Sequence, residues 1–517
     1  MREIILIYCL VPYLHIQSQD WKFIETNKGQ NTPYGITETY DGGFVFGLSN
    51  PANYNHLLFY KLDINGDLLW KRRYAIQGKF IAVTGGTIHL KNGGYILSGL
   101  TEAIDSIHDG DPFILKLDEC WNPIWFKIYN EPHQQNRIEQ IWEYNGKLLV
   151  NFAYLDRDYT TIALLNQEGA FMDKTTLKDL NYCKMKIRND KLIDLIGYGF
   201  PAGLLADKDI GIQKSLHIQL DSNLSIKKIH FFQYADTHFL SSSYDFVYLD
   251  SSTESFITSS NHRRPNGLNK NIDGSVMMTK NLKDSQWKII SDTSTYNSGI
   301  FMVRVSSNRY AISGNYNPQA NNTFWYYGKN YIIDSNFNII HQAFENPGPY
   351  TSMIKGLLRT SDGNLLTIGI HGISGNNWET YAYKYNPDLT SFKKTNFSRN
   401  YDSLCSSAVM SDSIELPAPK IVHMNKDSFL SMDISKVKSV LLFPNPAINY
   451  IQVQGIELLT PLSYEIYDVQ GQLKFKSDLA LYFDHVNIDI QLLTSGYYVI
   501  KIADNKGGLR TIKFMKE

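Results

Sequence analysis

The chain has 517 residues, too many for one ordinary hydrophobic core, so either two or three domains or one large repeat domain with a small second unit is expected. Lys and Arg (50) balance Asp and Glu (51), which argues against a nucleic-acid-binding protein, because such a protein needs uncompensated cations to displace phosphate counterions. The 34 Tyr, 26 Phe and 35 Gly residues favour strands joined by turns.

The chain begins with a short apolar stretch. Residues 4–14 read IILIYCLVPYL, and the polar sequence HIQSQ follows. This run is shorter than the roughly 20 residues of a membrane span but has the length of a signal-peptide core. Residues 1–18 are therefore predicted to be a signal peptide cleaved near Ser18, with a buried first strand as the alternative. Cys9 is not expected to carry lipid, because the bulky Tyr8 precedes it, and no other stretch is long and apolar enough to cross a bilayer.

Four widely separated cysteines occur in the chain: Cys9, Cys120, Cys183 and Cys405. None belongs to a C-x-x-C pair, so a zinc site is not expected. Without the leader three cysteines remain, and these allow either one long-range disulfide or buried thiols alone. The sequence leaves both alternatives open.

A repeated pattern begins after the leader. The sequence KLD occurs at 61–63 and again at 116–118, and Trp70 recurs as Trp125, so both features are 55 residues apart. Ahead of each KLD lies a Gly-Gly pair followed by apolar residues, DGGFVFG in the first copy and NGGYILSG in the second. This succession of turn residues and short apolar runs predicts pairs of strands.

The first copy contains the sequence DINGD at 63–67, which fits both the start of a calcium loop and the tight turn of a hairpin. The second copy reads DECWN at 118–122 and has lost the Asn-Gly pair and the last Asp. A calcium loop needs oxygen ligands at fixed positions, whereas a hairpin turn needs only residues that bend. The comparison of the two copies therefore predicts a turn.

Weaker copies of the same pattern continue along the chain. Their paired segments lie at 144–150 and 162–171, 189–193 and 216–224, 255–259 and 276–280, 308–314 and 331–337, and 361–369 and 381–389. Seven copies of about 50 residues, each with four strand signals, are typical of β-propeller blades. An all-β, seven-bladed β-propeller is therefore predicted for 19–400; two β-sandwiches are the alternative, but they leave the recurring offset unexplained.

Closure of such a ring needs a strand from one chain end beside the other. The sequence WKFI at 21–24 is similar to WKRR at 70–73, so it is predicted to pair into the last blade, with the segment 391–394 as a competitor for that place. The repeat as a whole, Gly-Gly-aromatic-apolar and then KLD with a later Gly and Trp, resembles the secreted propeller repeats of bacterial surface proteins. The resemblance is strong in the first two copies and weaker in the other five.

The pattern changes after the last copy. Residues 401–436 are rich in Ser and Asp, contain PAP at 417–419 and show no periodicity, so a linker is predicted. Residues 437–517 again contain short alternating runs, such as VNIDI at 486–490. Several strands in about 80 residues favour a small immunoglobulin-like β-sandwich.

The C-terminal segment also carries specific motifs: an FPNPA opening with Pro444, Asn445 and Pro446, a turn at Gly471, a second turn at Gly496 and Tyr497, and a terminal strand with Lys513 and Phe514. Together they resemble the type A C-terminal sorting domain of type IX secretion, with Phe443 where Tyr is usual. The resemblance implies export through an outer-membrane translocon, followed by removal of the domain and release or attachment to surface lipopolysaccharide. The implied partners are the translocon and its sorting protease and attachment machinery. A plain stabilising immunoglobulin-like domain is the alternative.

Few residues point to chemistry. No zinc-hydrolase, serine-hydrolase or phosphate-binding motif occurs. The loop DSIHDGD at 105–111 gathers three carboxylates, and Asp105, Asp109 and Asp111 are candidate ligands for Ca²⁺. Such runs also form solvated turns, and no other cofactor is expected.

Two further clusters fit sugar binding as well as plain structure. The sequence HRRP at 262–265 could hold an anionic sugar or be a solvated loop. The aromatic run TFWYY at 323–327 and Trp378 could stack on sugar rings or pack between sheets. Nothing in the sequence pairs two carboxylates, as glycoside hydrolysis requires.

These features together predict a secreted or cell-surface protein that acts as a non-catalytic binding or adhesion scaffold for glycan or protein. The alternatives are a propeller glycoside hydrolase or polysaccharide lyase, and a structural component of a surface layer. Neither a nucleic-acid partner nor a membrane span is expected.

Overall fold

The computed structural model describes residues 20–25, 32–49, 56–76, 81–101, 110–131, 136–154, 159–178, 180, 182–199, 214–231, 240–250, 255–263, 272–280, 284–289, 296–317, 327–345, 351–374, 377–394, 399–424, 430–433, 441–443, 447–454, 462–479, 485–503 and 509–517. Every regular element among them is a β-strand, so the all-β prediction is confirmed. In this part of the chain no helix could span a membrane. The predicted signal peptide lies outside it.

Most strands belong to seven sheets, each built from four antiparallel strands in the order of the chain. Sheet 1 holds β2 (Thr32–Glu38), β3 (Phe44–Ser49), β4 (His56–Leu62) and β5 (Leu68–Ala75). Sheet 2 holds β6 (Ile81–His89), β7 (Tyr95–Thr101), β8 (Asp111–Leu117) and β9 (Pro123–Asn130). Sheet 3 holds β10 (Asn136–Tyr144), β11 (Lys147–Tyr154), β12 (Tyr159–Leu165) and β13 (Phe171–Lys178).

The remaining four sheets repeat this order, except that sheet 7 takes its fourth strand from the start of the chain. Sheet 4 holds β14 (Tyr182–Ile187), β15 (Ile193–Gly199), β16 (Lys214–Leu220) and β17 (Ile226–Phe231). Sheet 5 holds β18 (Leu240–Asp250), β19 (Ser255–Arg263), β20 (Ile272–Lys280) and β21 (Asp284–Ile289). Sheet 6 holds β22 (Tyr296–Ser306), β23 (Arg309–Asn317), β24 (Tyr327–Asp334) and β25 (Ile339–Glu345). Sheet 7 holds β26 (Ser352–Arg359), β27 (Leu365–Ser374), β28 (Asn377–Tyr385) and β1 (Lys22–Glu25).

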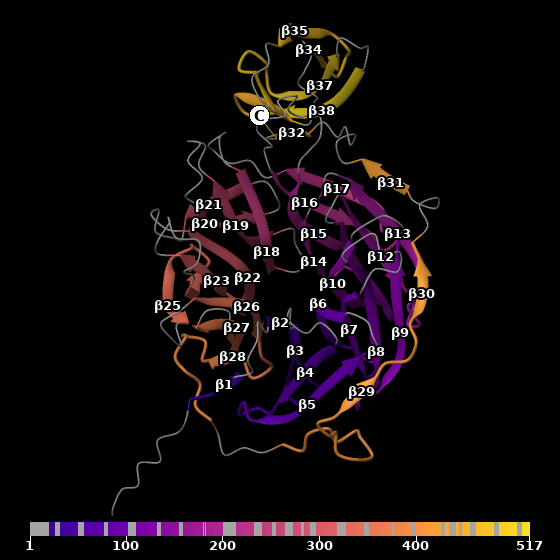
Figure 1. The fold of residues 1–517 in the computed structure, drawn as a ribbon. Helices are drawn as coiled ribbons and strands as arrows, with labels where there is room; N and C mark the ends of the chain where they lie inside the picture. Colours follow the sequence, from indigo (N-terminus) through magenta and orange to yellow (C-terminus); the bar gives the residue numbers. More distant parts are fainter. Residues whose placement is uncertain are drawn as a thin grey trace, which may run out of the picture.

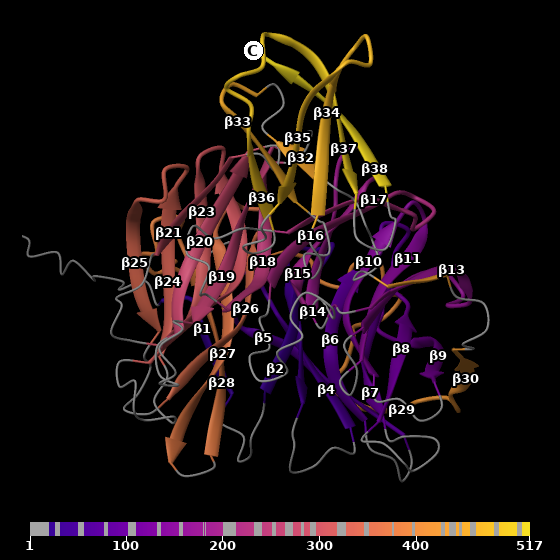
Figure 2. The ribbon, with the colours of Figure 1, turned by 90° about the horizontal axis from the view of Figure 1, so that it is seen from above.

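The seven sheets follow one another in a closed cycle, here called the ring. The first strand of each sheet packs against the first strand of the next, and β26 packs in turn against β2. Figure 1 shows these first strands around a common centre, and Figure 2 shows the same sheets from a direction at right angles. Strand β1 pairs with β28, with Lys22 opposite Tyr383, which confirms the predicted pairing of the N-terminal segment into the last sheet. The competing segment lies beside it, since Lys393 bridges to Asp20.

The repeated KLD turn is a hairpin loop, as predicted. Asp63 Oδ1 accepts hydrogen bonds from the backbone N–H groups of Asn65 and Asp67, both at 2.8 Å. Gly66 has φ +82°, which a residue without a side chain adopts at little cost. The turn is thus stabilised by its own aspartate, which explains why the second copy keeps Asp118 but not the other polar residues.

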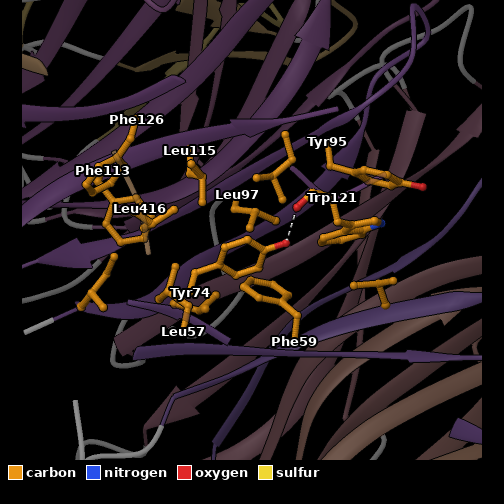
Figure 3. Close-up of a cluster of buried hydrophobic side chains, with 14 of the residues drawn as sticks. Leu57, Phe59, Tyr74, Tyr95, Leu97, Phe113, Leu115, Trp121, Phe126 and Leu416 are labelled. Atoms are coloured by element: carbon orange, nitrogen blue, oxygen red, sulfur yellow. Dashed lines mark hydrogen bonds between the residues drawn. The ribbon is translucent and has the colours of Figure 1, made fainter. Parts of the chain in front are cut away.

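In sheet 2 the same left-handed turn position holds Trp121, with φ 65°. This conformation costs roughly 1–2 kcal/mol for a residue with a side chain, and burial of the ring offsets it. Figure 3 shows Trp121 between the rings of Tyr95 and Phe59, and Tyr74 donates a hydrogen bond from its hydroxyl to the Trp121 carbonyl at 2.6 Å. The turn therefore supplies a core residue to the interface between sheets 1 and 2.

The lysine of the KLD motif is buried in sheet 1. Lys61 Nζ lies 2.5 Å from Asp41 Oδ2 and 2.6 Å from Asp402 Oδ1. Burial acts to raise the pKa of Asp41, but the charge and hydrogen bond of Lys61 hold it below its ordinary value. Sheet 7 repeats the device, with Lys384 Nζ 2.6 Å from Asp362 Oδ2. In sheets 1 and 7 this lysine therefore ties the third strand to the turn between the first two strands, whereas Lys116 in sheet 2 bonds to Gln167 of sheet 3.

The segment that follows the ring runs along its outer edge and is here called the strap (residues 399–424 and 430–433). Its three short strands pair in parallel with the fourth strands of sheets 1, 2 and 3: β29 (Ser413–Glu415) with β5, β30 (Lys420–His423) with β9, and β31 (Leu430–Asp433) with β13. Figure 1 shows them in orange beside these sheets. The sequence predicted a linker here, and the structure adds a role that the missing periodicity did not indicate.

Side chains anchor the strap as well as backbone pairing. A disulfide joins Cys405 to Cys120 in the turn of sheet 2, across 285 residues of sequence, and this pairing decides between the alternatives that the sequence left open. Cys183 is a buried free thiol. Arg72 Nε lies 2.9 Å from Asp412 Oδ1. The strap is therefore bonded covalently and by charge to the first two sheets.

The C-terminal residues form two further sheets with their own apolar core. One holds β32 (Leu441–Phe443), β33 (Tyr450–Gln454) and β36 (His485–Asp489). The other holds, in spatial order, β35 (Leu473–Leu479), β34 (Leu462–Asp468), β37 (Gly496–Ala503) and β38 (Leu509–Lys516). Residues from both sheets share this core, for example Ile451 and Ile488 from the first and Ile466 and Ile500 from the second, so the described part is two sheets packed on one another, as in a sandwich.

Candidate functional site

The residues predicted as a sorting motif occupy different places in the C-terminal sheets. Gly471 has φ +78° in a turn whose Asp468 accepts hydrogen bonds from two backbone N–H groups, the same turn as in the ring. Phe514 is buried and stacks on Tyr498, with the ring centres 5.6 Å apart. Gly496 begins β37 and Lys513 lies on β38, while Pro444, Asn445 and Pro446 fall outside the described residues.

The two C-terminal sheets expose several large apolar side chains. Ile448, Tyr450, Leu492 and Tyr497 are all more than half exposed, Leu492 by 89%. Tyr450 precedes the core residue Ile451 on β33 and Tyr497 precedes the core residue Tyr498 on β37, so the two tyrosines point away from the core on different sheets. Exposed apolar residues that do not form one contiguous patch are normal on a protein surface.

The predicted calcium loop is described only in part. Asp105 and Asp109 lie outside the described residues. Asp111 begins β8, is buried, and accepts a hydrogen bond from Asn130 Nδ2 at 3.0 Å. Among the described residues no group of three His, Cys, Asp or Glu side chains could hold a metal ion, so the calcium site stays a prediction.

The other clusters singled out in the sequence are also only partly described. Of the HRRP cluster, residues 262 and 263 belong to β19, and the rest lies outside the described residues. Of the aromatic run, only Tyr327 is described, at the start of β24. Trp378 is half-buried on β28. The described residues of these clusters are not shown to come together in one site.

A pocket of about 180 Å³ opens at the closure of the ring, and is here called the seam pocket. It lies between β25 of sheet 6 and the strands β28 and β1 of sheet 7. Its walls include two acidic, one basic and three aromatic side chains, among them Asp20, Glu345, Lys22, Phe344, Tyr383 and Tyr385. Two of these precede or begin β1, so the pocket is complete only when the N-terminal strand has closed the ring.

The sequence of β28 explains why aromatic rings face this pocket. Successive side chains of a strand point to opposite faces. Ala382 packs with the core shared with sheet 1, and Lys384 Nζ lies 5.3 Å from the centre of the Phe44 ring. Tyr383 and Tyr385 therefore point the other way, toward sheet 6, where Tyr385 packs against the core that the two sheets share.

Glu345 is the buried acid of the seam pocket. Asn330 Nδ2 donates a hydrogen bond to its Oε1 at 2.6 Å, and the Thr367 hydroxyl donates to the same oxygen. Oε2 is also buried, and the hydroxyls of Tyr381 and Tyr385 act on the same carboxyl as hydrogen-bond donors. Burial raises the pKa of Glu345, and the polar groups around it, Thr367 first and then Tyr381, do not offset this effect. The carboxyl is therefore held toward its neutral form.

A second buried acid, Asp194 in sheet 4, shows the opposite behaviour. His217 Nε2 and the Tyr248 hydroxyl each lie 2.8 Å from one of its two oxygens, and Gln219 Nε2 donates to the first at 3.1 Å. Burial acts to raise the pKa of Asp194, but these hydrogen bonds and the charge of His217 bring it below its ordinary value. Asp194 is thus a fully satisfied structural carboxylate, whereas the buried carboxyl of Glu345 is held toward its neutral form.

Comparison with protein families identifies the C-terminal sheets. The model of the secretion system C-terminal sorting domain matches residues 441–517. Residues 441–517 are a C-terminal sorting domain of type IX secretion. The protein is accordingly exported to the cell surface or the extracellular space. The sorting domain also implies contact with the secretion machinery.

Comparison with solved structures gives weak similarities over about seven tenths of the chain or more. The extracellular domain of a hybrid two-component system from B. thetaiotaomicron has a TM-score of 0.39 and 12% identity over 94% of this chain and 56% of that chain, so this chain spans little more than half of that one. A protein of unknown function from Dyadobacter fermentans has a TM-score of 0.38 and 10% identity, covering 71% and 98%. The NanB sialidase from Streptococcus pneumoniae has a TM-score of 0.36 and 9% identity, covering 72% and 71%. No curated protein matches the sequence.

Sequence reasoning missed the seam pocket. Glu345 lies at the end of an ordinary strand sequence, IIHQAFE, and nothing in that run distinguishes it from an exposed acid. The one available signal was the alternation of Tyr381, Tyr383 and Tyr385, which places three aromatic rings on the same face of a strand. Whether these rings line a pocket depends on which sheet faces the strand. Only the tertiary structure decides this.

Proposed function

We propose that residues 20–394 form a seven-bladed β-propeller and that the exported protein is a non-catalytic scaffold that binds a glycan or a protein. The architecture is supported by seven four-stranded sheets in a closed cycle and by the N-terminal strand that completes the last of them. In this arrangement each sheet buries both faces against its neighbours, which a single sheet cannot do alone.

The binding role is carried by one observation, the seam pocket. It combines aromatic side chains with a few polar groups, and ligand sites are typically built in this way. The sorting domain places this pocket outside the cell, where glycans and the proteins of other cells are the available ligands. The strap and the disulfide support the same role, because they stabilise a rigid ring rather than a moving lid.

A second candidate function is glycoside hydrolysis, favoured by one specific feature of the same pocket. Both Asp20 and Glu345 line it, and glycosidases use a pair of carboxyl groups, one of them an acid with a raised pKa. Glu345 has the raised pKa, while Asp20 pairs with Lys393 at the surface.

Binding and hydrolysis are separated by one experiment on the full chain. The purified protein is applied to a glycan array and, in parallel, incubated with soluble polysaccharides whose reducing ends are assayed. Binding without release of reducing sugar supports the scaffold. Release that is lost in Asp20→Asn and in Glu345→Gln supports the hydrolase, and neither binding nor release, with no protein ligand captured from target cells, contradicts both.

Processing of the chain follows from its two ends. Removal of a signal peptide near Ser18 and of the sorting domain near residue 440 would leave the ring and the strap at the surface, either released or attached to lipopolysaccharide. The partners in these steps are the type IX translocon and its sorting protease and attachment machinery. Mass spectrometry of the surface-exposed protein tests this, since intact ends at both sites would contradict it.

A further inference from the structure

We propose that the outer edge of β25, together with the seam pocket, binds an extended peptide segment of a partner protein, in the way that the strap binds the outer edges of sheets 1 and 2. The proposal rests on the scaffold function proposed above and names its partner class: a protein segment in extended conformation with apolar residues at alternate positions. Such a segment adds a parallel strand to sheet 6 and places one apolar side chain in the seam pocket.

The strap already shows this docking mode twice. Strands β29 and β30 pair in parallel with the last residues of β5 and β9. Directly after each of them an apolar residue bonds to the end of the fourth strand: the Leu416 N–H donates to the Ala75 carbonyl, and the Met424 N–H donates to the Asn130 carbonyl, both at 2.8 Å. Leu416 is buried between sheets 1 and 2, and Met424 is buried between sheets 2 and 3. The mode is therefore a short parallel strand followed by an apolar anchor.

Sheet 6 has the corresponding edge without a strap strand on it. Its ladder keeps the register of sheet 1 when counted from the aspartate of the turn, Asp63 in sheet 1 and Asp334 in sheet 6. Glu345 is therefore the counterpart of Tyr74, the residue opposite Ile414 of the strap. Among the described residues β25 has no further strand partner. Figures 1 and 2 show it at the outer edge of the ring, on the side away from the strap.

The side chains of β25 suit a strand that pairs with another chain. Ile339, Ile340 and Phe344 are each more than a third exposed. The strand, IIHQAFE, has no Lys, Arg or Pro, whereas β17 on the edge of sheet 4 carries two lysines. Lysine and proline are the residues that commonly protect an edge strand from pairing. An apolar edge without them favours the addition of a strand.

The seam pocket lies where the anchor of such a strand belongs. Phe344 and Glu345, at the end of β25, form one wall, and residues of sheet 7 form the other. Leu416 and Met424 occupy the same place in their own sheets, at the end of the fourth strand and against the next sheet. A cavity of about 150 Å³ holds a benzene ring, so the seam pocket of about 180 Å³ has room for one side chain of the size of Leu or Met.

The test uses the sequence of the strap as the probe. A fluorescent peptide APKIVHM, residues 418–424, and a matched peptide with Met424→Asp are titrated into the full chain, and fluorescence anisotropy measures the affinity. The first peptide is expected to bind and to slow hydrogen–deuterium exchange of the backbone amides of 339–345. The second is expected to bind at least tenfold more weakly, because burial of an ionised carboxyl is unfavourable.

Two variants separate the edge from the pocket. Gln342 is the counterpart of Lys71, whose N–H donates to Ser411 Oγ of the strap at 3.0 Å. Gln342→Pro removes this donor at an edge that tolerates proline, and it is expected to weaken the first peptide at least tenfold. Ser391→Trp fills the pocket from an exposed position on its wall, so it should weaken the first peptide about tenfold and leave the second unchanged. Lys227→Ala, on the edge of sheet 4, is the control and should leave both affinities unchanged.

Each outcome decides. Binding that Gln342→Pro and Ser391→Trp leave unchanged, or protection of a strand other than β25, overturns β25 as the docking edge and leaves the scaffold function standing. No binding of the first peptide by the unaltered chain overturns this proposal, while the glycan array and the capture of a protein ligand still test the scaffold. Dimerisation of the unaltered chain that Gln342→Pro abolishes makes a second copy the occupant and overturns the partner protein. Where Gln342→Pro does not fold, Ser391→Trp gives the answer.

Discussion

Sheets 1–3 and sheets 4–6 are built from the same repeat but differ at their outer edges. The fourth strands of sheets 1–3 (β5, β9 and β13) each pair with a strand of the strap. Among the described residues, the fourth strands of sheets 4–6 (β17, β21 and β25) have no further partner. An unpaired edge strand offers its backbone groups to any other chain, so the two halves of the ring meet the same problem in different ways.

The edge strands of sheets 4 and 6 carry different kinds of side chain. Strand β17 carries Lys227 and Lys228, and charged side chains discourage edge-to-edge pairing. Strand β25 instead exposes Ile340 and Phe344, and its last residue, Glu345, lines the seam pocket. The comparison teaches that the strap stabilises sheets 1–3, whereas the candidate binding site lies between sheets 6 and 7, away from the strap.

The largest expected effect concerns the covalent anchor of the strap. Replacing Cys120 and Cys405 together by serine should lower the free energy of unfolding by as much as about 5 kcal/mol, because the bridge closes a loop of 285 residues. Chemical denaturation of the full chain measures this change. Cys183→Ser, which alters a buried thiol outside the strap, serves as the control, with a loss of about 1 kcal/mol expected. An unchanged midpoint in the double variant would show that the strap adds nothing to the stability of the ring.

The second effect concerns the buried lysine of sheet 1. Lys61→Met should cost about 3–5 kcal/mol, because it leaves two carboxylates, Asp41 and Asp402, without their cation. Lys384→Met in sheet 7 is the matched control and should cost less, since its partner Asp362 is 31% exposed and no strap residue joins the pair. Denaturant unfolding compares them, and equal losses would contradict a contribution from the strap.

The third effect is a dependence of stability on pH. Burial acts to raise the pKa of Asp362, but the hydrogen bond and charge of Lys384, with help from Thr360, lower it from 3.8 to about 2. The folded state therefore binds this proton less readily than the unfolded state, so the stabilisation is complete above about pH 4 and is lost as the pH falls toward 2. The melting temperature between pH 2 and 6 should depend less on pH in Asp362→Asn than in the unaltered chain. Parallel curves would show that the pair does not contribute.

The smallest effect concerns a single hydrogen bond between the strap and sheet 1. The Tyr401 hydroxyl accepts a bond from the Ile64 N–H at 2.8 Å. Tyr401→Phe should therefore cost about 1 kcal/mol, and Tyr450→Phe, at an exposed position of the sorting domain, should cost almost nothing. Thermal unfolding of the two variants measures the difference, and a larger loss in the second would be unexpected.

Features that depend on neighbouring residues were accessible from the sequence. The turn at Asp63 could be identified because its hydrogen bonds join residues two and four positions apart. The pairing of Trp21 to Ile24 into the last sheet could be inferred because the segment is similar to the fourth strand of sheet 1. The sorting domain could be recognised because its turns and terminal strand form a fixed local pattern.

The strap and the seam pocket were not accessible in this way. Strands of three or four residues such as β29 and β30 pair through their backbone, so they leave no periodicity in their side chains. The partner of Cys405 could be named only when the path of the chain around the ring was known.

The sequence by itself determined the β-strand content, the repeated hairpin and the exported fate of the protein, because each is written in residues that lie close together in the chain. The tertiary structure alone decided which edges are covered, which cysteines meet and that Glu345 is buried at the seam pocket. These properties arise from contacts between residues up to several hundred positions apart, and the ring has to close before they exist.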